Sequence, residues 1–365
     1  MKRSLSFVGS GAALAAGASA AMALAAAALA APAAAAPRNN YVTHNLVSDQ
    51  TGKADHVDPN LENAWGLAAR VDSPWWVADN GTNLATVYTA DGVAFAPSGS
   101  PLVVDVPDAP TGTVANSGST FVIKAGAASA PALFLFATEE GKILGWNQAI
   151  PPAQAVPAAD RSGADANYKG LAISGGRLYA TDFHNGRVDV FDGSFTRISR
   201  RGAFVDRKLP RGFAPFGIQA IGGRIFVSYA KQDANREDDV DGRGLGFVDA
   251  FDRNGKLLAR VARRGPLNAP WGVARAPRNF GRFSGDLLVG NFGDGKINAY
   301  KQRRGRTFAH VGELRTREGR ALVIDGLWAL QFGHGTANNG PTNTLFFTAG
   351  PDDEAHGLFG TITGQ

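Results

Sequence analysis

A pattern that recurs about every fifty residues constrains the fold of this chain more than any other feature. A glycine preceded by a bulky or charged residue and followed by an apolar one occurs five times. The five copies are Trp65-Gly66-Leu67, Lys169-Gly170-Leu171, Phe216-Gly217-Ile218, Trp271-Gly272-Val273 and Asp325-Gly326-Leu327. The glycines lie 104, 47, 55 and 54 positions apart, so the first gap spans two periods. A degraded copy is expected near the middle of that gap, at residues 121–123.

Each copy continues with two further β-rich runs, joined by turns rich in Gly, Asn and Asp. The second runs cover residues 75–79, 133–138, 177–182, 224–229, 286–291 and 344–349, and the third runs cover residues 85–92, 143–148, 188–193, 247–255, 297–305 and 357–363. Turns such as Asp79-Asn80-Gly81 are those that β-hairpins require. The second runs end in polar residues such as Glu139 and Asp182, which turn chemistry explains without a ligand.

Six copies of a multi-strand unit predict an all-β fold, a six-bladed β-propeller. The last copy ends at its third strand, whereas residues 41–47 form a spare strand at the start of the repeats. We therefore expect the N-terminal strand to complete the last blade and close the ring, which removes free sheet edges. A β-helix, the alternative, would need shorter and more regular coils.

Residues 1–35 predict a secretory signal peptide, followed by a single propeller domain over residues 36–365. Lys2 and Arg3 precede an uncharged, Ala-rich stretch, and small residues offer cleavage sites after Ala30 or Ala35. The alternative is an uncleaved membrane anchor. No later run is apolar enough to span a bilayer, so we expect an exported monomer, periplasmic or extracellular, without a membrane span after cleavage.

The chain contains no cysteine, and its only methionines are Met1 and Met22. Disulfides, thiolate zinc sites and cysteine nucleophiles are therefore excluded. The formal net charge is +5, with arginine concentrated in residues 197–211, 253–264 and 303–320. Export argues against nucleic acid as a partner. The arginines are read either as solvated charges on outer strands or as contacts to anionic cell-surface polymers.

Three segments carry a resemblance to a known group of proteins. They are Asn63-Ala64-Trp65-Gly66-Leu67, the acidic loop Asp238-Asp239-Val240-Asp241-Gly242, and the run from Gly350 to Gly360. With them, the chain resembles a family of uncharacterised secreted bacterial propeller proteins, and the blade over residues 167–192 is similar to NHL-type repeats. The resemblance implies a six-bladed propeller of the NHL or TolB-like kind, and it implies no activity.

The loops that enter the innermost strands of a propeller converge on one mouth of its channel. The residue before each repeat glycine is therefore a candidate ligand contact: Trp65, Lys169, Phe216, Trp271 and Asp325. An aromatic mouth with one cation and one carboxylate suits a sugar, lactone or aromatic ligand. The alternative is that these rings pack between blades. We therefore expect a binding module for an extracellular glycan, polymer or protein.

The second hypothesis is a lactonase-like hydrolase or lyase with one divalent cation, such as calcium, in the channel. The oxygen donors near the inner strands are Glu62, Asn63, Asn167, Asn268 and Asp325. The acids Glu237, Asp239 and Asp241 alternate as in a calcium loop, although Val248 stands where a closing carboxylate belongs. This loop lies in a long insertion, residues 231–246, expected at a blade edge. Asp182 and His184 are the candidate catalytic pair for general base chemistry.

Overall fold

The computed structural model describes residues 38–151 and 154–365. The chain divides into two units, residues 1–36 and 37–365, and the second unit is described below. The predicted signal peptide lies outside the described residues, so export stays a prediction. None of the helices in the described part of the chain is long and apolar enough to cross a membrane.

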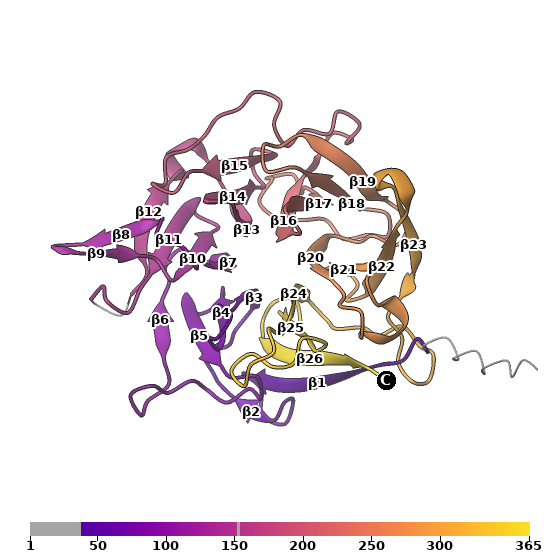
Figure 1. The fold of residues 1–365 in the computed structure, drawn as a ribbon, viewed down its shortest axis with the longest axis horizontal. Helices are drawn as coiled ribbons and strands as arrows, with labels where there is room; N and C mark the ends of the chain where they lie inside the picture. The colour runs from indigo at the N-terminus through magenta and orange to yellow at the C-terminus, as the bar shows by residue number, and fades with distance from the viewer. Residues whose placement is uncertain (1–37, 152–153) are drawn as a thin grey trace, which may run out of the picture. The chain divides into compact units, whose positions relative to one another are not determined.

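The propeller unit consists of six sheets, antiparallel except for one short pair, arranged as blades around a central channel, as Figure 1 shows. The prediction of a six-bladed β-propeller is confirmed. From the channel outwards, the first blade has β3 (Ala64–Ala68), β4 (Trp75–Asp79), β5 (Leu84–Tyr88) and β6 (Val103–Asp105). The second blade has β7 (Pro110–Ala115), β10 (Phe134–Thr138), β11 (Lys142–Trp146) and β12 (Val156–Asp160). The third blade has only β13 (Tyr168–Ser174), β14 (Arg177–Asp182) and β15 (Arg187–Phe191).

The remaining blades follow the same order. The fourth has β16 (Phe213–Ile221), β17 (Arg224–Lys231), β18 (Gly246–Phe251) and β19 (Leu257–Arg263). The fifth has β20 (Pro270–Arg275), β21 (Leu287–Asn291), β22 (Ile297–Gln302) and β23 (Phe308–Glu313). The sixth has β24 (Leu327–Phe332), β25 (Leu345–Ala349) and β26 (Leu358–Gly364), continued by β1 (Tyr41–Ser48) and β2 (His56–Val57). Outside this pattern lie a hairpin, β8 (Val122–Ala125) and β9 (Ala128–Pro131), and the 3-10 turns η1 (Ser162–Ala164), η2 (Gly281–Phe283) and η3 (Arg304–Arg306).

The N-terminal strand closes the ring, as the spare strand in the sequence predicts. β1 pairs antiparallel with β26, from Tyr41 opposite Gly364 to Ser48 opposite Leu358. The two ends of the propeller unit therefore lie in one sheet (Figure 1). Tyr41 is buried, and its hydroxyl donates to the carbonyl of Phe280 in the fifth blade at 3.0 Å. Strand β1 is thus paired with β26 of the sixth blade, and its first residue is also bound to the fifth blade.

Two copies of the repeat lie elsewhere than the glycine pattern predicts. The second copy is Thr111-Gly112-Thr113 on β7, and residues 121–123 lie outside the inner strand, where β8 begins. The sixth copy is Trp328-Ala329-Leu330 rather than Asp325-Gly326-Leu327, because Ala329 N donates to Thr348 Oγ1 as Gly217 N donates to Ser228 Oγ. The glycine pattern fails to identify these two copies for different reasons. In the second copy, threonine stands on both sides of the glycine, and in the sixth copy alanine replaces the glycine.

Close approach of neighbouring inner strands explains the repeat glycine. A Cβ on Gly217 would meet the carbonyl oxygen of Trp271 in the next blade, and one on Gly272 would meet that of Trp328. Threonine hydroxyls tie the same layer together, since Thr181 Oγ1 donates to the Phe216 carbonyl at 2.6 Å and Thr348 Oγ1 donates to the Trp65 carbonyl at 2.5 Å. The six residues that precede this position are therefore held at one level of the channel.

Candidate functional site: the acidic mouth of the channel

The end of the channel where the inner strands begin holds a cavity of about 230 Å³. Its wall combines residues from the inner strands with residues from the loops that join second and third strands. Its side chains, called the mouth below, are Trp65, Lys169, Phe216, Asp238, Asp239, Asp241, Phe292, Asp325, Trp328, Asp353 and Glu354. The mouth is therefore built from most of the blades and depends on ring closure.

Stacked aromatic rings form the floor of the mouth. The rings of Trp65 and Trp328 stack with centroids 3.7 Å apart, and Phe292 stacks on Trp328 at 4.0 Å. Phe216 packs edge-on against Trp328 at 5.8 Å. Trp65, Trp328 and Phe216 are each at most 2% exposed, whereas Phe292 is half-buried. Trp65 and Phe216, for which packing between blades is the alternative to ligand contact, are thus buried by neighbouring rings and also line the mouth.

A single asparagine holds both stacked indoles in place. Asn63 Oδ1 accepts the indole N–H of Trp65 at 2.9 Å and that of Trp328 at 3.2 Å. Its amide nitrogen donates to Glu354 Oε2 at 2.6 Å and to Asn80 Oδ1 at 3.3 Å. Asn63 has φ of 45°, a left-handed conformation that asparagine tolerates better than most residues. Its side chain therefore joins the aromatic floor to the carboxylates above it.

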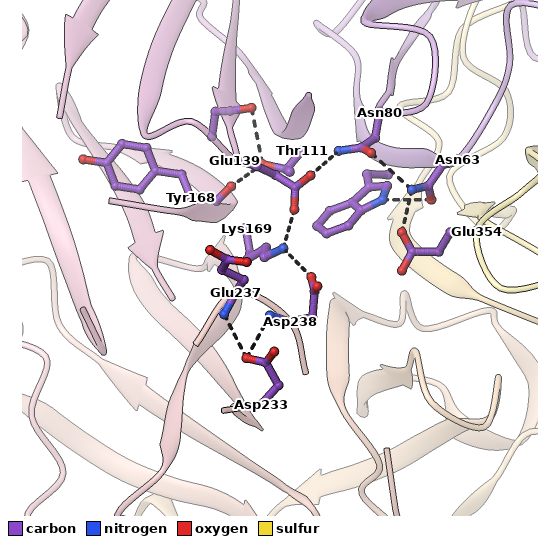
Figure 2. A network of polar contacts seen from close by, with 12 residues as sticks. Asn63, Asn80, Thr111, Glu139, Tyr168, Lys169, Asp233, Glu237, Asp238 and Glu354 are labelled. Atoms are coloured by element: carbon purple, nitrogen blue, oxygen red, sulfur yellow. Dashed lines mark hydrogen bonds and ion pairs between the residues drawn. The ribbon is translucent and has the colours of Figure 1, made fainter. Parts of the chain in front are cut away.

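Lys169 supplies a positive charge on one side of the mouth. Its buried ammonium group pairs with Glu139 and, at 3.2 Å, with Asp238, and it lies 5.3 Å from the ring centroid of Trp65. Figure 2 shows that the network continues from Glu139 through Asn80, whose amide donates to Glu139 Oε2 at 3.1 Å. Burial alone would lower the pKa of Lys169, but the charges of Glu139 and Asp238 hold that pKa above its ordinary value. Lys169 is therefore a cation already bound to both carboxylates and the ring.

The opposite side of the mouth carries carboxylates without a matching cation. Within the described residues, none of the following forms an ion pair: Asp239, Asp241, Asp325, Asp353 and Glu354. Burial and the charge of Asp241 raise the pKa of Asp239 to about 8. Burial also raises the pKa of Asp241 and of Glu354, helped at Asp241 by the nearby Asp294 and Asp353. Asp239 Oδ2 is buried and accepts no hydrogen bond from the described part of the protein.

A wider cavity of about 620 Å³ adjoins the mouth and shares Asp238 with it. It is also acidic, and its charged or polar lining residues include Glu139, Glu140, Asp165, Asn167, His184 and Glu237. The loop after β17 supplies acids to both cavities. The prediction that this insertion lies at a blade edge is therefore wrong, because the contact between Asp238 and Lys169 places it over the channel.

Most of the predicted ligand contacts meet in the mouth. Trp65, Lys169 and Phe216 line it, and so does Asp325, although Asp325 comes from the loop before β24 rather than from the repeat position. Trp271 does not line it. Trp271 contacts the two stacked indoles edge-on, donates its N–H to the Lys169 carbonyl at 3.1 Å, and faces a narrower part of the channel beside Leu171 and Gln219.

The predicted catalytic pair does not form. Asp182 is fully buried and binds the side-chain amide of Asn185 at 2.9 Å and the guanidinium of Arg187 at 2.9 Å. His184 lines the wider acidic cavity, where no described hydrogen bond or ion pair joins it to Asp182. Asp182 therefore completes a turn, the role that turn chemistry gives to a carboxylate at a strand end.

The proposed metal donors do not converge. Asn63 Oδ1 is taken by two indoles, Asn268 Oδ1 accepts the amide of Gly242 at 2.6 Å, and Asp325 Oδ2 accepts that of Asp352 at 2.9 Å. Glu62 packs beside Gly81, and Asn167 and Glu237 line the wider cavity, away from Asp239 and Asp241. No group of three carboxylate or histidine side chains in residues 38–151 and 154–365 is arranged to hold a metal ion. These residues do not fit a resident calcium ion.

Sequence comparison finds relatives of unknown activity. No protein-family profile matches the chain. The chain is 33% identical over 327 residues to the uncharacterized protein R648 of Acanthamoeba polyphaga mimivirus, a match that covers 87% of this chain and 78% of that protein. It is 33% identical over 327 residues to the uncharacterized protein L690 of the same virus, covering 87% of this chain and 84% of the relative.

Structural comparison supports the fold. The calcium-binding protein regucalcin from Agrobacterium tumefaciens is similar with a TM-score of 0.50 at 12% identity, over 89% of this chain and 96% of that structure. Such low identity carries the propeller fold alone. The predicted resemblance to uncharacterised proteins is confirmed, although these curated relatives are viral, and the bacterial origin, the secretion and the NHL type of the family stay predictions. The chain belongs to the same protein family as the uncharacterized mimivirus proteins R648 and L690.

Proposed function

We propose that this propeller is a binding module whose channel mouth takes a ligand with an organic cationic group, such as a substituted ammonium. The observation that carries the proposal is the division of charge in the mouth. Lys169 pairs with Asp238 in the cavity and with Glu139 beside it, whereas five other acidic side chains line the cavity without a paired cation. A positively charged group placed there relieves their mutual repulsion.

The aromatic floor favours an organic cation over a bare metal ion. Cations bind over aromatic faces because the ring quadrupole presents negative charge there, with about 0.5–2 kcal/mol gained per contact. Lys169 already uses Trp65 in this way. Half-buried Phe292, stacked on Trp328, offers the corresponding surface beside Asp241 and Glu354. Metal ions instead require several oxygen ligands at one point, which this donor set does not provide.

The proposal includes the compartment in which the ligand is bound. The charged start, apolar stretch and small residues of segment 1–35 support export, so we place the ligand outside the cytoplasm. Glycans and lactones suit an aromatic mouth with one cation and one carboxylate, and they are less well matched by a mouth in which most polar groups are carboxylates.

Titration with a matched pair of small probes tests the proposal. Choline and 3,3-dimethylbutan-1-ol have nearly the same shape, and only choline is charged. We expect choline to change the tryptophan fluorescence and to bind at least about tenfold more tightly than the neutral alcohol. Equal affinity for the two probes, or no binding of either, contradicts the proposal.

Substitutions in the mouth test whether choline binds there. Asp241→Asn and Asp353→Asn each remove one unpaired charge and leave the bonds of Lys169 and Asn63 intact. Each is expected to weaken choline binding several-fold, since one nearby opposite charge is lost. Asp91→Asn removes an exposed charge outside the mouth and serves as the control, with unchanged binding.

A further inference from the structure

We propose that the third blade binds an extended acidic peptide, which adds the fourth strand that this blade lacks. The other five blades carry an outer strand, namely β6, β12, β19, β23 and β1. The third blade ends at β15, beyond which Figure 1 shows no further strand. This site lies on the outside of the ring and is independent of the channel mouth.

The chain begins a fourth strand here and then leaves it. Arg197 lies opposite Phe191 as an isolated bridge, and the amide of Ile198 donates to the carbonyl of Val190 at 2.7 Å. The next residues turn toward the fourth blade, where the amide of Phe204 donates to the Gly255 carbonyl at 2.8 Å. The remainder of the β15 edge is left uncovered.

The uncovered part of the edge has free backbone groups. Residues of an antiparallel strand bond alternately to one side and the other, so the outward bond of Val190 implies that Val188 also faces outward. Neither the N–H nor the C=O of Val188 has a hydrogen-bond partner among the residues that the structure describes. An added strand would pair with these groups.

A cavity of about 150 Å³ lies beside this edge and is lined by five arginines. Arg187 and Arg197 are paired with the buried carboxylates of Asp182 and Asp189. The other three, Arg177, Arg200 and Arg253, have no carboxylate partner in the described part of the chain, although Arg177 donates to the Arg253 carbonyl and to Asn254. Unpaired guanidinium groups are strong, bidentate partners for carboxylates.

The floor of the same cavity is apolar. Val188, Val190, Ile198, Ala203 and Phe204 line it between the two blades. An extended peptide meets all three features at once: its backbone pairs with the β15 edge, an apolar side chain enters the cavity, and an acidic side chain reaches the unpaired arginines. Addition of a strand to an exposed sheet edge is an established mode of peptide recognition, and the surplus of arginine selects an acidic sequence.

Binding of the blocked peptide acetyl-Val-Glu-Val-Glu-Val-amide, measured by calorimetry, tests the inference. We expect binding that weakens about tenfold or more when glutamine replaces both glutamates or when the peptide amides are N-methylated, since N-methyl groups prevent strand pairing. Glutarate, which has the carboxylates without the backbone, is expected to compete weakly. Absence of peptide binding, or equal binding of the N-methylated peptide, overturns the inference.

Protein variants separate the contribution of the arginine side chains from that of strand pairing. Arg200→Gln and Arg253→Gln are expected to weaken binding several-fold each, whereas Arg278→Gln, an exposed arginine outside the cavity, leaves it unchanged. Val188→Pro removes an outward N–H that the fold does not use, a position where an edge strand accepts proline. A folded Val188→Pro variant that binds the peptide as tightly as the parent chain contradicts strand addition.

Discussion

The indole rings of Trp65 and Trp328 stack with centroids 3.7 Å apart, although the two residues are 263 positions apart in the sequence. Trp65 is the second residue of β3 in the first blade and Trp328 the second residue of β24 in the sixth, so the stack lies across the junction where the ring closes. Asn63 accepts a hydrogen bond from each indole and donates one to Glu354. Ring closure and the acidic mouth are therefore held by the same three side chains.

Removal of one stacked indole is expected to destabilise the propeller strongly. Trp328→Ala deletes a fully buried ring with four aromatic neighbours and should lower the free energy of unfolding by about 3–5 kcal/mol. Denaturant titration followed by circular dichroism measures the loss. Trp271→Ala, which truncates a partly exposed indole in the same layer, should cost clearly less. A larger loss in Trp271→Ala contradicts the assignment of the stack as the closing contact.

Loss of the Asn63 side chain is expected to leave two buried indole N–H groups without acceptors. Asn63→Gly keeps the left-handed backbone and should cost roughly 2–4 kcal/mol, because each unsatisfied buried donor costs about 1–3 kcal/mol. The matched control is Asn83→Gly, also at positive φ, whose side chain makes one exposed bond to Ala109. Thermal melts of both variants give the comparison, and similar melting temperatures would show that the Asn63 bonds add no stability.

A single methyl group at a repeat glycine is expected to disturb the contact between blades. In Gly217→Ala the new Cβ meets the Trp271 carbonyl, and overpacking of this kind costs about 1–3 kcal/mol. Gly163→Ala is the control, because a Cβ there meets no atom within 4 Å and the backbone has no positive φ. Chemical denaturation of both variants checks the difference. A Gly217→Ala protein as stable as the control means that close approach does not explain the repeat.

The pKa of Asp239 predicts a specific dependence of stability on pH. That pKa is raised from an ordinary value of 3.8 to about 8, so the folded protein holds a proton that the unfolded chain releases above about pH 4. The contribution of Asp239 to stability therefore falls as pH rises from about 4 to about 8 and is lost above that range. Asp239→Asn cannot ionise and should escape this loss. Its melting temperature relative to the parent should rise by several degrees between pH 5 and pH 9, whereas an unchanged difference contradicts burial of this carboxyl.

Much of the fold follows from local sequence patterns. Strand runs, turns and the glycine spacing predict six blades, and the spare strand at Tyr41 predicts how the ring closes, because these features depend on neighbouring residues. The sequence also predicts that Lys169, Trp65 and Phe216 line the mouth, because each directly precedes a repeat glycine. Trp328 is missed because Ala329 takes the place of that glycine, although the run Trp-small-Leu matches Trp65-Gly66-Leu67.

The acidic half of the mouth is not predictable in this way. Asp239, Asp241 and Glu354 come from two loops whose sequences fit ordinary turns. No feature of either loop sequence indicates that the loop folds over the channel. Their positions depend on contacts with distant residues, such as Asp238 with Lys169 and Glu354 with Asn63. The charge of the site thus becomes visible only when the blades are assembled.

Calorimetric titration of choline into the parent protein at pH 6.5 and pH 9.0 tests the central claim most directly. Choline keeps its charge over this range, so any change in affinity reports on the protein. Ionisation of Asp239 between these values adds a negative charge to the mouth, and we expect choline to bind about tenfold more tightly at pH 9.0, with little change in Asp239→Asn. No measurable binding of choline, or an affinity that is independent of pH, contradicts a cation-binding mouth.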